Sequence, residues 1–314
     1  MRKVPKYYLR IGLSLTAVFL VVSHLMFYRK VPSRITPKAC LSVRGRLGNL
    51  MFQYAFLHSI SKSKGLYPVI PDTFEPGDVF KINRTTLKLI GEDGAACDKI
   101  PSYTERWPCS FDDRLTDVPI YQSAKFNGYF QSWKYWIQHE NSLREAFHFQ
   151  DKIAERAQKQ LRDILNTSKF VSSNSTLVGV HIRRGDYTAK HVNDYGQITP
   201  NVSYYENAIQ YFEDLYPSVF FIVASDDLIW TKQAMINRTN VHISVGNSGP
   251  EDMALLSLTH HTIMSVGTFG WWVAWMTRGT TVYYKPVFAP GSLYARDFNH
   301  DVSNFIYPGW IPMT

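Results

Sequence analysis

The second half of the chain alternates short apolar runs with amphipathic stretches, and this alternation restricts the possible folds more than any other feature. The runs that predict strands are 177–182, 218–224, 241–245, 262–266 and 280–284; the patterns that predict helices between them are 202–215, 227–236, 251–260 and 269–277. Near-continuous apolar strands separated by helices are typical of a parallel sheet covered on both faces. The sequence therefore predicts a doubly wound α/β fold for this half.

The first half shows the same kind of pattern less clearly. A strand is predicted at 40–43, a helix follows from about Leu50 to a C-cap at Gly65, and a second strand starts near Val69. Residues 71–120 read as irregular, 124–136 contains another strand, and two helices are predicted within 140–166. We predict an N-terminal lobe at 40–170 and a C-terminal lobe at 171–314, and we expect the aromatic tail from Pro286 to pack back over the second sheet.

The charge of the chain is unevenly distributed. The 314 residues carry a formal net charge of +8, but residues 1–38 hold eight of the 34 Lys and Arg residues and no Asp or Glu. The rest of the chain has 26 basic and 26 acidic residues and is neutral overall. The basic excess therefore belongs to a terminal segment and does not indicate a nucleic-acid partner.

That terminal segment has the layout of a signal-anchor. Residues 11–28 are mostly apolar and contain no Asp, Glu, Lys or Arg. This segment is just long enough for one transmembrane helix. A cleaved signal peptide is the alternative, but the run is longer than usual and lacks a small-residue cleavage site. We expect a cytoplasmic tail at 1–10, an anchor at 11–28 and a stem at 29–39. Five glycosylation sequons follow the anchor, which favours a lumenal position for the rest of the chain. They start at Asn83, Asn166, Asn174, Asn201 and Asn237.

The chain has three cysteines, Cys40, Cys97 and Cys109, and no Cys-x-x-Cys pair. This spacing argues against a zinc site. One disulfide is possible in an oxidising compartment, and the simplest pairing is Cys97–Cys109.

Two adjacent arginines, Arg183 and Arg184, end the apolar run at 177–182. Ligands of open α/β sheets bind beyond the carboxyl ends of the strands, and paired guanidinium groups suit a diphosphate. Strand alternation places His181 and Arg183 on the same side. The alternatives are structural ion pairs for the arginines, a core position for His181, and adhesion through Arg184-Gly185-Asp186, which would need an exposed loop.

Three further segments end strands in the same way. Gly45 to Asn49 is a glycine loop before a helix, which suits a phosphate but also a plain turn. Asp226 follows the strand at 218–224 and can bind a guanine edge or cap the next helix. Thr268 follows the strand at 262–266, where its hydroxyl and nearby amides can bind a phosphate. The tryptophans behind it are more typical of a core.

No Asp-x-Asp pattern, which often holds a divalent cation against a diphosphate, is present in the chain. We therefore predict no metal and assign the neutralisation of a departing diphosphate to Arg183 and Arg184. Asp186 lies next to them and is the candidate general base.

These segments, taken in order, resemble those of the α-1,2-fucosyltransferases, the glycosyltransferase family 11 type. The matching segments are Gly-Arg-Leu-Gly-Asn at 45–49, Gly-Tyr-Phe-Gln-Ser-Trp-Lys-Tyr at 128–135, His-Ile-Arg-Arg-Gly-Asp-Tyr at 181–187, Ala-Ser-Asp-Asp at 224–227 and Gly-Thr-Phe-Gly-Trp-Trp at 267–272. The resemblance spans about residues 40–284. It departs from the family at Leu50, at Phe52 and at the bulky Trp271, Trp272 and Trp275, which we expect near the acceptor side.

The resemblance implies a GT-B-like fold with two Rossmann-like lobes behind one transmembrane helix. It implies inverting, metal-independent transfer of L-fucose from GDP-β-L-fucose, with no other cofactor, to the 2-hydroxyl of a terminal galactose. The chain would then be a single-pass type II Golgi membrane protein with a lumenal catalytic part. The alternatives are a catalytically silent Golgi glycan-binding protein of the same fold and a fucosyltransferase of different linkage.

The resemblance also implies roles for single residues. Arg183 and Arg184 would hold the pyrophosphate. The remaining donor-binding residues would be His181 and Asp226 at the nucleoside, Thr268 and Phe269 at the phosphates, and Gly48 and Asn49 approaching from the first lobe.

Overall fold

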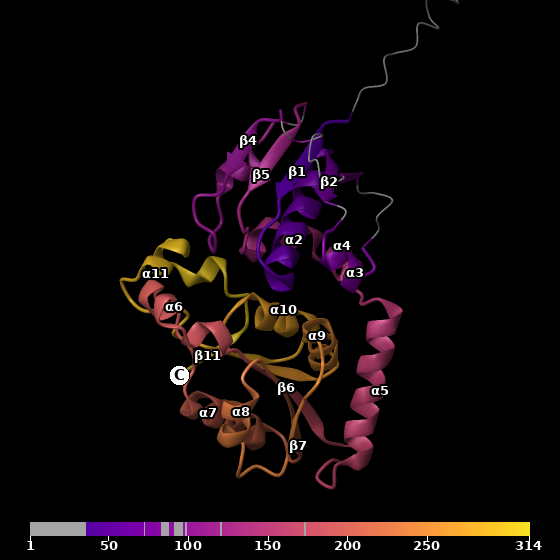
Figure 1. Ribbon diagram of the computed structural model, residues 1–314, viewed down its shortest axis with the longest axis vertical. Coiled ribbons are helices and arrows are strands. Elements are labelled where there is room, and N and C mark those ends of the chain that lie inside the picture. Colours follow the sequence, from indigo (N-terminus) through magenta and orange to yellow (C-terminus); the bar gives the residue numbers. More distant parts are fainter. Residues whose placement is uncertain are drawn as a thin grey trace, which may run out of the picture. The chain divides into compact units, whose positions relative to one another are not determined.

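Two parallel β-sheets, one in each half of the chain, form the framework of the structure. The computed structural model describes residues 36–71, 73–82, 88–90, 97, 99–119, 121–172 and 174–314, and Figure 1 shows how their elements are arranged. All pairings between neighbouring strands within the two sheets are parallel. The α/β class with parallel sheets is therefore confirmed.

The first sheet has five strands in the order β3-β2-β1-β5-β4. Its elements are β1 (Lys38–Ser42), α2 (Leu47–Lys64), β2 (Tyr67–Pro71), α3 (Pro76–Val79), β3 (Lys88–Ile90), β4 (Ser102–Thr104), β5 (Ala124–Asn127) and α4 (Glu140–Ala146). The predicted helix after the glycine loop is α2, and Gly65 ends it in the left-handed conformation with φ of 64°. The prediction that 71–120 is irregular missed α3, β3 and β4, which are too short for a periodic pattern to reveal.

The second sheet has six strands in the order β11-β10-β9-β6-β7-β8. Its strands are β6 (Thr176–Ile182), β7 (Val219–Ser225), β8 (Val241–Ile243), β9 (His261–Met264), β10 (Thr281–Tyr284) and β11 (Ile311–Met313). Its helices are α5 (Asp151–Thr167), α6 (Lys190–Tyr195), α7 (Val202–Leu215), α8 (Leu228–Ala234), α9 (Gly249–Ser257), α10 (Thr268–Thr277) and α11 (Leu293–Asp297). The strands and helices predicted after residue 177 are all found, with ends shifted by up to three residues.

The helices α2 and α10 carry the core that lies between the two sheets, and Figure 1 shows them next to each other. Trp271 and Trp272 on α10 are fully buried and pack against Phe52 of α2, with ring centroids 4.7 Å away in both cases. Trp136, also fully buried, stacks on Trp272. The tryptophans of 271–275 are thus core residues, as is typical of them, and the acceptor side expected near them stays a prediction.

The tail after Pro286 crosses back to the first half of the chain before it adds β11 to the edge of the second sheet. The indole N–H of Trp271 donates to the carbonyl of Phe305 over 2.8 Å, and the Ser132 hydroxyl donates to the carbonyl of Asn304 over 2.7 Å. Two consecutive non-glycine residues, Asn299 and His300, have positive φ angles of 49° and 59° just after the C-cap of α11 at Phe298. Such backbone strain persists only where surrounding contacts hold it.

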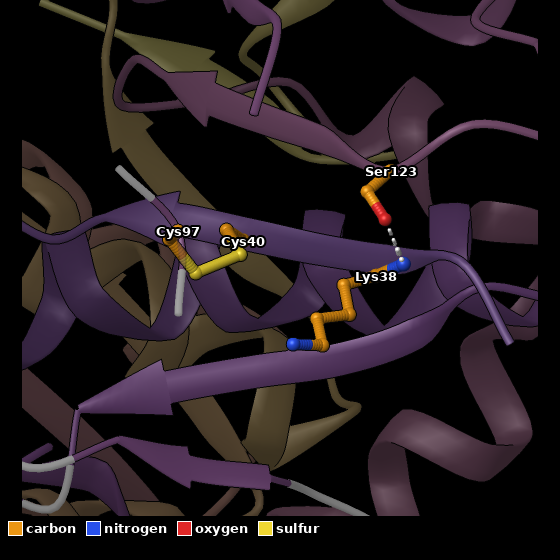
Figure 2. Close-up of a disulfide and its surroundings, with 4 residues drawn as sticks. All are labelled: Lys38, Cys40, Cys97 and Ser123. Carbon is orange, nitrogen blue, oxygen red and sulfur yellow. Dashed lines mark hydrogen bonds between the residues drawn. A yellow bond between two sulfur atoms is a disulfide. The ribbon is translucent and has the colours of Figure 1, made fainter. Parts of the chain in front are cut away.

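A disulfide joins Cys40 on β1 to Cys97, and Figure 2 shows it beside the hydrogen bond from the Lys38 backbone N–H to the Ser123 hydroxyl, 2.9 Å long. The suggested Cys97–Cys109 pairing was therefore wrong. Cys109 is a free, buried thiol that donates to the side-chain oxygen of Gln131. The simple pairing failed because closeness in sequence does not tell which cysteine the sheet brings within reach.

Removing this disulfide with the double substitution C40A/C97A is expected to lower the free energy of unfolding by about 4 kcal/mol, as the chain-entropy model gives for a loop of this length. The two cysteines are 57 residues apart. Urea unfolding measures the loss. The control is Cys109→Ala, whose Tm should still fall on addition of dithiothreitol, whereas the Tm of C40A/C97A should not respond. A wild-type Tm that ignores dithiothreitol would contradict the assignment.

The described residues include four of the five predicted sequons and none of the predicted anchor. Asn166, Asn174, Asn201 and Asn237 are exposed, whereas Asn83 lies outside the described residues. The predicted anchor at 11–28 also lies outside them. Within the described ranges, no helix combines the length and hydrophobicity that a membrane span requires.

Candidate functional site

The strand order of each sheet fixes where a ligand can bind. In the second sheet the direction of winding reverses between β6 and β9, and in the first sheet it reverses between β1 and β5. A crevice opens at the carboxyl ends of the strands on either side of such a switch point. The motifs at 45–49, 128–135, 181–187 and 267–272 lie at the carboxyl ends of β1, β5, β6 and β9, respectively. The two sheets therefore bring these four motifs together.

A cavity of about 750 Å³ lies at these strand ends and takes residues from both halves of the chain. Its volume is in the range of sites for small molecules and cofactors. The lining includes nearly all predicted site residues: Gly48, Asn49, His181, Arg183, Asp186, Asp226, Thr268 and Phe269. Arg184 is the exception.

The N-termini of α2 and α10 meet at this cavity. The Trp272 indole donates to the carbonyl of Gly48 over 2.9 Å, and the Thr268 hydroxyl donates to the side-chain oxygen of Asn49 over 2.8 Å. A β-carbon on Gly48 would lie 2.7 Å from the Thr268 hydroxyl and 2.8 Å from the Phe269 amide nitrogen, so only glycine allows this approach.

Neither helix start is capped by a side chain. The N-cap residues are Arg46 for α2 and Gly267 for α10, and neither makes a side-chain cap hydrogen bond. The first backbone N–H groups of a helix lack partners within the helix and carry its positive dipole end. Two such ends facing one cavity are suited to a phosphate group or another anion.

Arg183 supplies a cation at the same place. Its side chain is 16% exposed, it forms ion pairs with Asp226 and Asp186, and it lies over the ring of Tyr187. Asp186 also pairs with Arg46 over 3.0 Å, so it joins cations from the two halves of the chain. The guanidinium of Arg183 is thus positioned by carboxylates and directed toward the cavity.

Asp226 holds the turn that carries the arginines. One of its oxygens accepts the backbone N–H groups of Arg184 and Gly185, over 2.8 and 3.1 Å, while the other pairs with Arg183. The alternative role considered for Asp226 was to cap α8. Asp227 has this role instead, because its side chain accepts the N–H of Trp230.

Arg184 has a different environment from Arg183 and does not line the cavity, so its role at the pyrophosphate stays a prediction. Its guanidinium lies over the indole of Trp230, 4.1 Å from the ring, and its Nε donates to Asp227 over 3.3 Å. β6 ends at Ile182, and the backbone at Arg184 has left the extended conformation, with ψ of −59°. The side chain is only 19% exposed, so the Arg-Gly-Asp tripeptide does not present its arginine for adhesion.

His181 lies in the wall of the cavity beside Phe269, with ring centroids 5.2 Å apart. Burial lowers the pKa of its imidazole to about 4, so the ring is neutral at physiological pH. Its Nδ1 is buried and has no hydrogen-bond partner among the described residues, and Gly270 packs directly against it. A β-carbon at position 270 would collide with this ring.

Several lining residues were not predicted from the sequence, among them Arg46, Gln131, Asp252 and Asp297. Arg46 and Gln131 stood inside recognised motifs but were not singled out, and Gln131 donates to the Asn49 side-chain oxygen over 3.0 Å. Asp252 is the fourth residue of α9, and Asp297 ends α11 in the tail. Neither has a local signal, because only the tertiary fold brings them to the cavity. In the described ranges, no group of three or more His, Cys, Asp or Glu side chains is placed to hold a metal ion.

The two parallel sheets and the site between their carboxyl ends define a GT-B-like α/β fold. Solved structures share it: the NodZ α-1,6-fucosyltransferase soaked with GDP-fucose aligns with a TM-score of 0.54 at 15% identity, over 79% of this chain and 95% of that one. POFUT1 in complex with GDP aligns with a TM-score of 0.51 at 12% identity, over 79% of this chain and 98% of that one. At these identities the likeness concerns the fold alone.

The sequence comparison gives the family. The profile of glycosyl transferase family 11 matches residues 9–314, and the chain belongs to this family. A curated relative, galactoside 2-alpha-L-fucosyltransferase Sec1 of Mus musculus, is 30% identical over 275 residues, which cover 86% of this chain and 72% of that protein. The resemblance drawn from the motifs is thereby confirmed.

Proposed function

We propose that this enzyme transfers L-fucose from GDP-β-L-fucose to the 2-hydroxyl of a terminal galactose on glycans, with inversion and without a metal ion. The family and the name of the mouse relative support the acceptor and the linkage. The NodZ enzyme supports the donor, because it has the same fold and its crystals were soaked with GDP-fucose.

The observation that carries the proposal is the meeting of two uncapped helix N-termini and Arg183 at one cavity. A nucleoside diphosphate brings negative charge that these groups suit. Gly48, Asn49, Thr268 and Phe269 would lie against the phosphates, and His181 with Asp226 would lie at the nucleoside. Incoming phosphate oxygens would compete with Asp186 for Arg183 and Arg46.

The chemistry follows from this arrangement. The bond between C1 of fucose and the phosphate oxygen breaks, and its electron pair leaves with GDP. Arg183 and the two helix N-termini, already oriented, stabilise the charge that develops on the β-phosphate. The acceptor hydroxyl attacks C1 from the opposite face, which inverts the configuration.

The proposal includes the location of the enzyme. It would be a single-pass type II protein of the Golgi membrane, with the anchor at 11–28, the stem at 29–39 and the catalytic part in the lumen. The lobe at 171–314 would bind the nucleotide, and the lobe at 40–170 would supply most of the acceptor side.

A donor and acceptor screen of the full chain in detergent micelles tests the proposed activity. In EDTA, the enzyme should release GDP from GDP-fucose when lactose is present, and NMR of the product should show fucose on O2 of galactose. GDP binding without transfer to any galactoside would favour a silent glycan-binding protein. A product bond at another hydroxyl, or a requirement for Mn²⁺, would contradict the proposal.

A further inference from the structure

The proposed transfer needs a group that takes the proton of the acceptor hydroxyl, and the cavity offers carboxylates for this role. Its lining contains five of them: Glu75, Asp186, Asp226, Asp252 and Asp297. The ion-pair and hydrogen-bond partners of these carboxylates differ, and they distinguish Asp297 from the other four.

Two of the five pair with arginines, and a third accepts two hydrogen bonds. Asp186 and Asp226 form ion pairs with Arg183, and Asp186 pairs with Arg46 as well. Asp252 on α9 accepts both hydrogen bonds at its Oδ1, from the Ser244 hydroxyl over 2.8 Å and the Asn247 amide over 3.0 Å. Glu75 precedes α3 and is exposed to solvent.

Asp297 is half-buried, and the hydrogen-bond partner of its carboxylate is neutral: the Tyr195 hydroxyl donates to its Oδ2 over 2.9 Å. Among the described residues, no lysine or arginine lies within ion-pair distance of it. The titratable groups that face it are Tyr195 from α6, Tyr294 from α11 and the Cys109 thiol, with Glu105 behind the thiol. Its carboxylate is therefore not neutralised by a cation and has an oxygen free for another donor.

A chain of contacts connects Asp297 to the meeting point of the two helix N-termini. The backbone N–H of Cys109 donates to the carbonyl of Asp297 over 2.9 Å, and the Cys109 thiol donates to Gln131 over 3.2 Å. Gln131 in turn donates to Asn49, which also accepts from Thr268.

We propose that Asp297 is the general base of the reaction, with Tyr195 as the residue that positions it; this rests on the fucosyl transfer proposed above. As the acceptor oxygen bonds to C1 of fucose, its proton passes to the Asp297 carboxylate, and the C1–O electron pair departs with GDP. The protonated carboxyl group then returns the proton to solvent.

The environment suits this task. Burial raises the pKa of Asp297, although the hydrogen bond from Tyr195 opposes the shift. A base works best with a pKa closer to the working pH. Activity should therefore fall as the pH drops toward this raised pKa. The acid limb of the pH–activity profile should lie above the ordinary pKa range of aspartate.

Asp297→Asn tests the assignment. Its kcat for transfer to lactose should fall about 100-fold or more, the acid limb should disappear, and the Kd for GDP should stay within about twofold. Sodium azide needs no base, so it should restore GDP release from GDP-fucose in this variant. Asp301→Asn, in the same segment and hydrogen-bonded to Ser303, is the matched control and should keep wild-type kinetics.

A second variant tests the positioning role. Tyr195→Phe removes the hydrogen bond that lowers the pKa of Asp297, so its acid limb should move to higher pH. Full activity of Asp297→Asn, or GDP binding without azide rescue, would overturn the assignment. An acid limb that disappears in Asp186→Asn or Glu75→Gln instead would also overturn it. If the wild-type enzyme transfers no fucose at all, the proposed function fails and the base assignment falls with it.

Discussion

Arg183→Lys is expected to lower kcat/KM for fucosyl transfer by about 100-fold or more, whereas Arg184→Lys is expected to lower it by less than about tenfold. The reason is geometric: Arg183 lines the cavity and is aligned by two carboxylates, while Arg184 lies on Trp230 outside the lining. A lysine keeps the charge of Arg183 but loses its planar fork, and losing one preorganised stabiliser of a transition state costs about this factor.

Steady-state kinetics with GDP-fucose and lactose measures both variants. Arg184→Lys should show its effect in stability instead, with a loss of about 0.5–1 kcal/mol from the weaker contact with Trp230. Equal losses of activity in the two variants would mean that the neighbouring arginines act as a pair at the phosphates, as the motif alone suggested.

Gly48→Ala is expected to abolish most of the activity, about 100-fold or more, because displacements of about 1 Å at a preorganised site have effects of this size. The added β-carbon would lie 2.7–2.8 Å from atoms of Thr268 and Phe269, two of which belong to the α10 backbone. The helix starts must then separate, and the backbone N–H groups lose their common focus.

Kinetics together with GDP binding tests this prediction. Both kcat and GDP affinity should fall, whereas circular dichroism should still show a folded protein. Thr268→Ser is the companion variant, because it keeps the hydroxyl that donates to Asn49 and should retain most of the activity. Wild-type activity of Gly48→Ala would show that the close approach of α2 and α10 is not needed.

Local patterns predicted much of the fold. The helix predicted at 202–215 is α7, Val202–Leu215, because an amphipathic pattern follows a capping residue, Asn201, whose side chain accepts the N–H of Tyr204 over 3.1 Å. β4 and β11 were missed because three-residue strands form only where a neighbouring strand already offers hydrogen bonds. The Cys40–Cys97 disulfide depends on the same tertiary information.

The cavity residues that could be predicted are those whose chemistry suits a ligand and that lie at the end of a strand. Gly48, His181, Arg183 and Thr268 all line the cavity, because parallel strands place their following loops at one edge. Arg184 lies over Trp230 and outside the lining, because β6 ends at Ile182 and the backbone turns after it. Asp297 could not be found from the sequence, since the tail reaches the cavity only through contacts with the first half of the chain.

The central claim is that Arg183 holds the diphosphate of the donor, and calorimetric titration of GDP and GMP into wild type and Arg183→Ala tests it most directly. In EDTA, wild type should prefer GDP over GMP, and the substitution should reduce that preference by about 1.5–3 kcal/mol, the energy of a charge-assisted hydrogen bond. If the preference for GDP is the same in both proteins, the guanidinium of Arg183 does not contact the terminal phosphate, and the account is wrong.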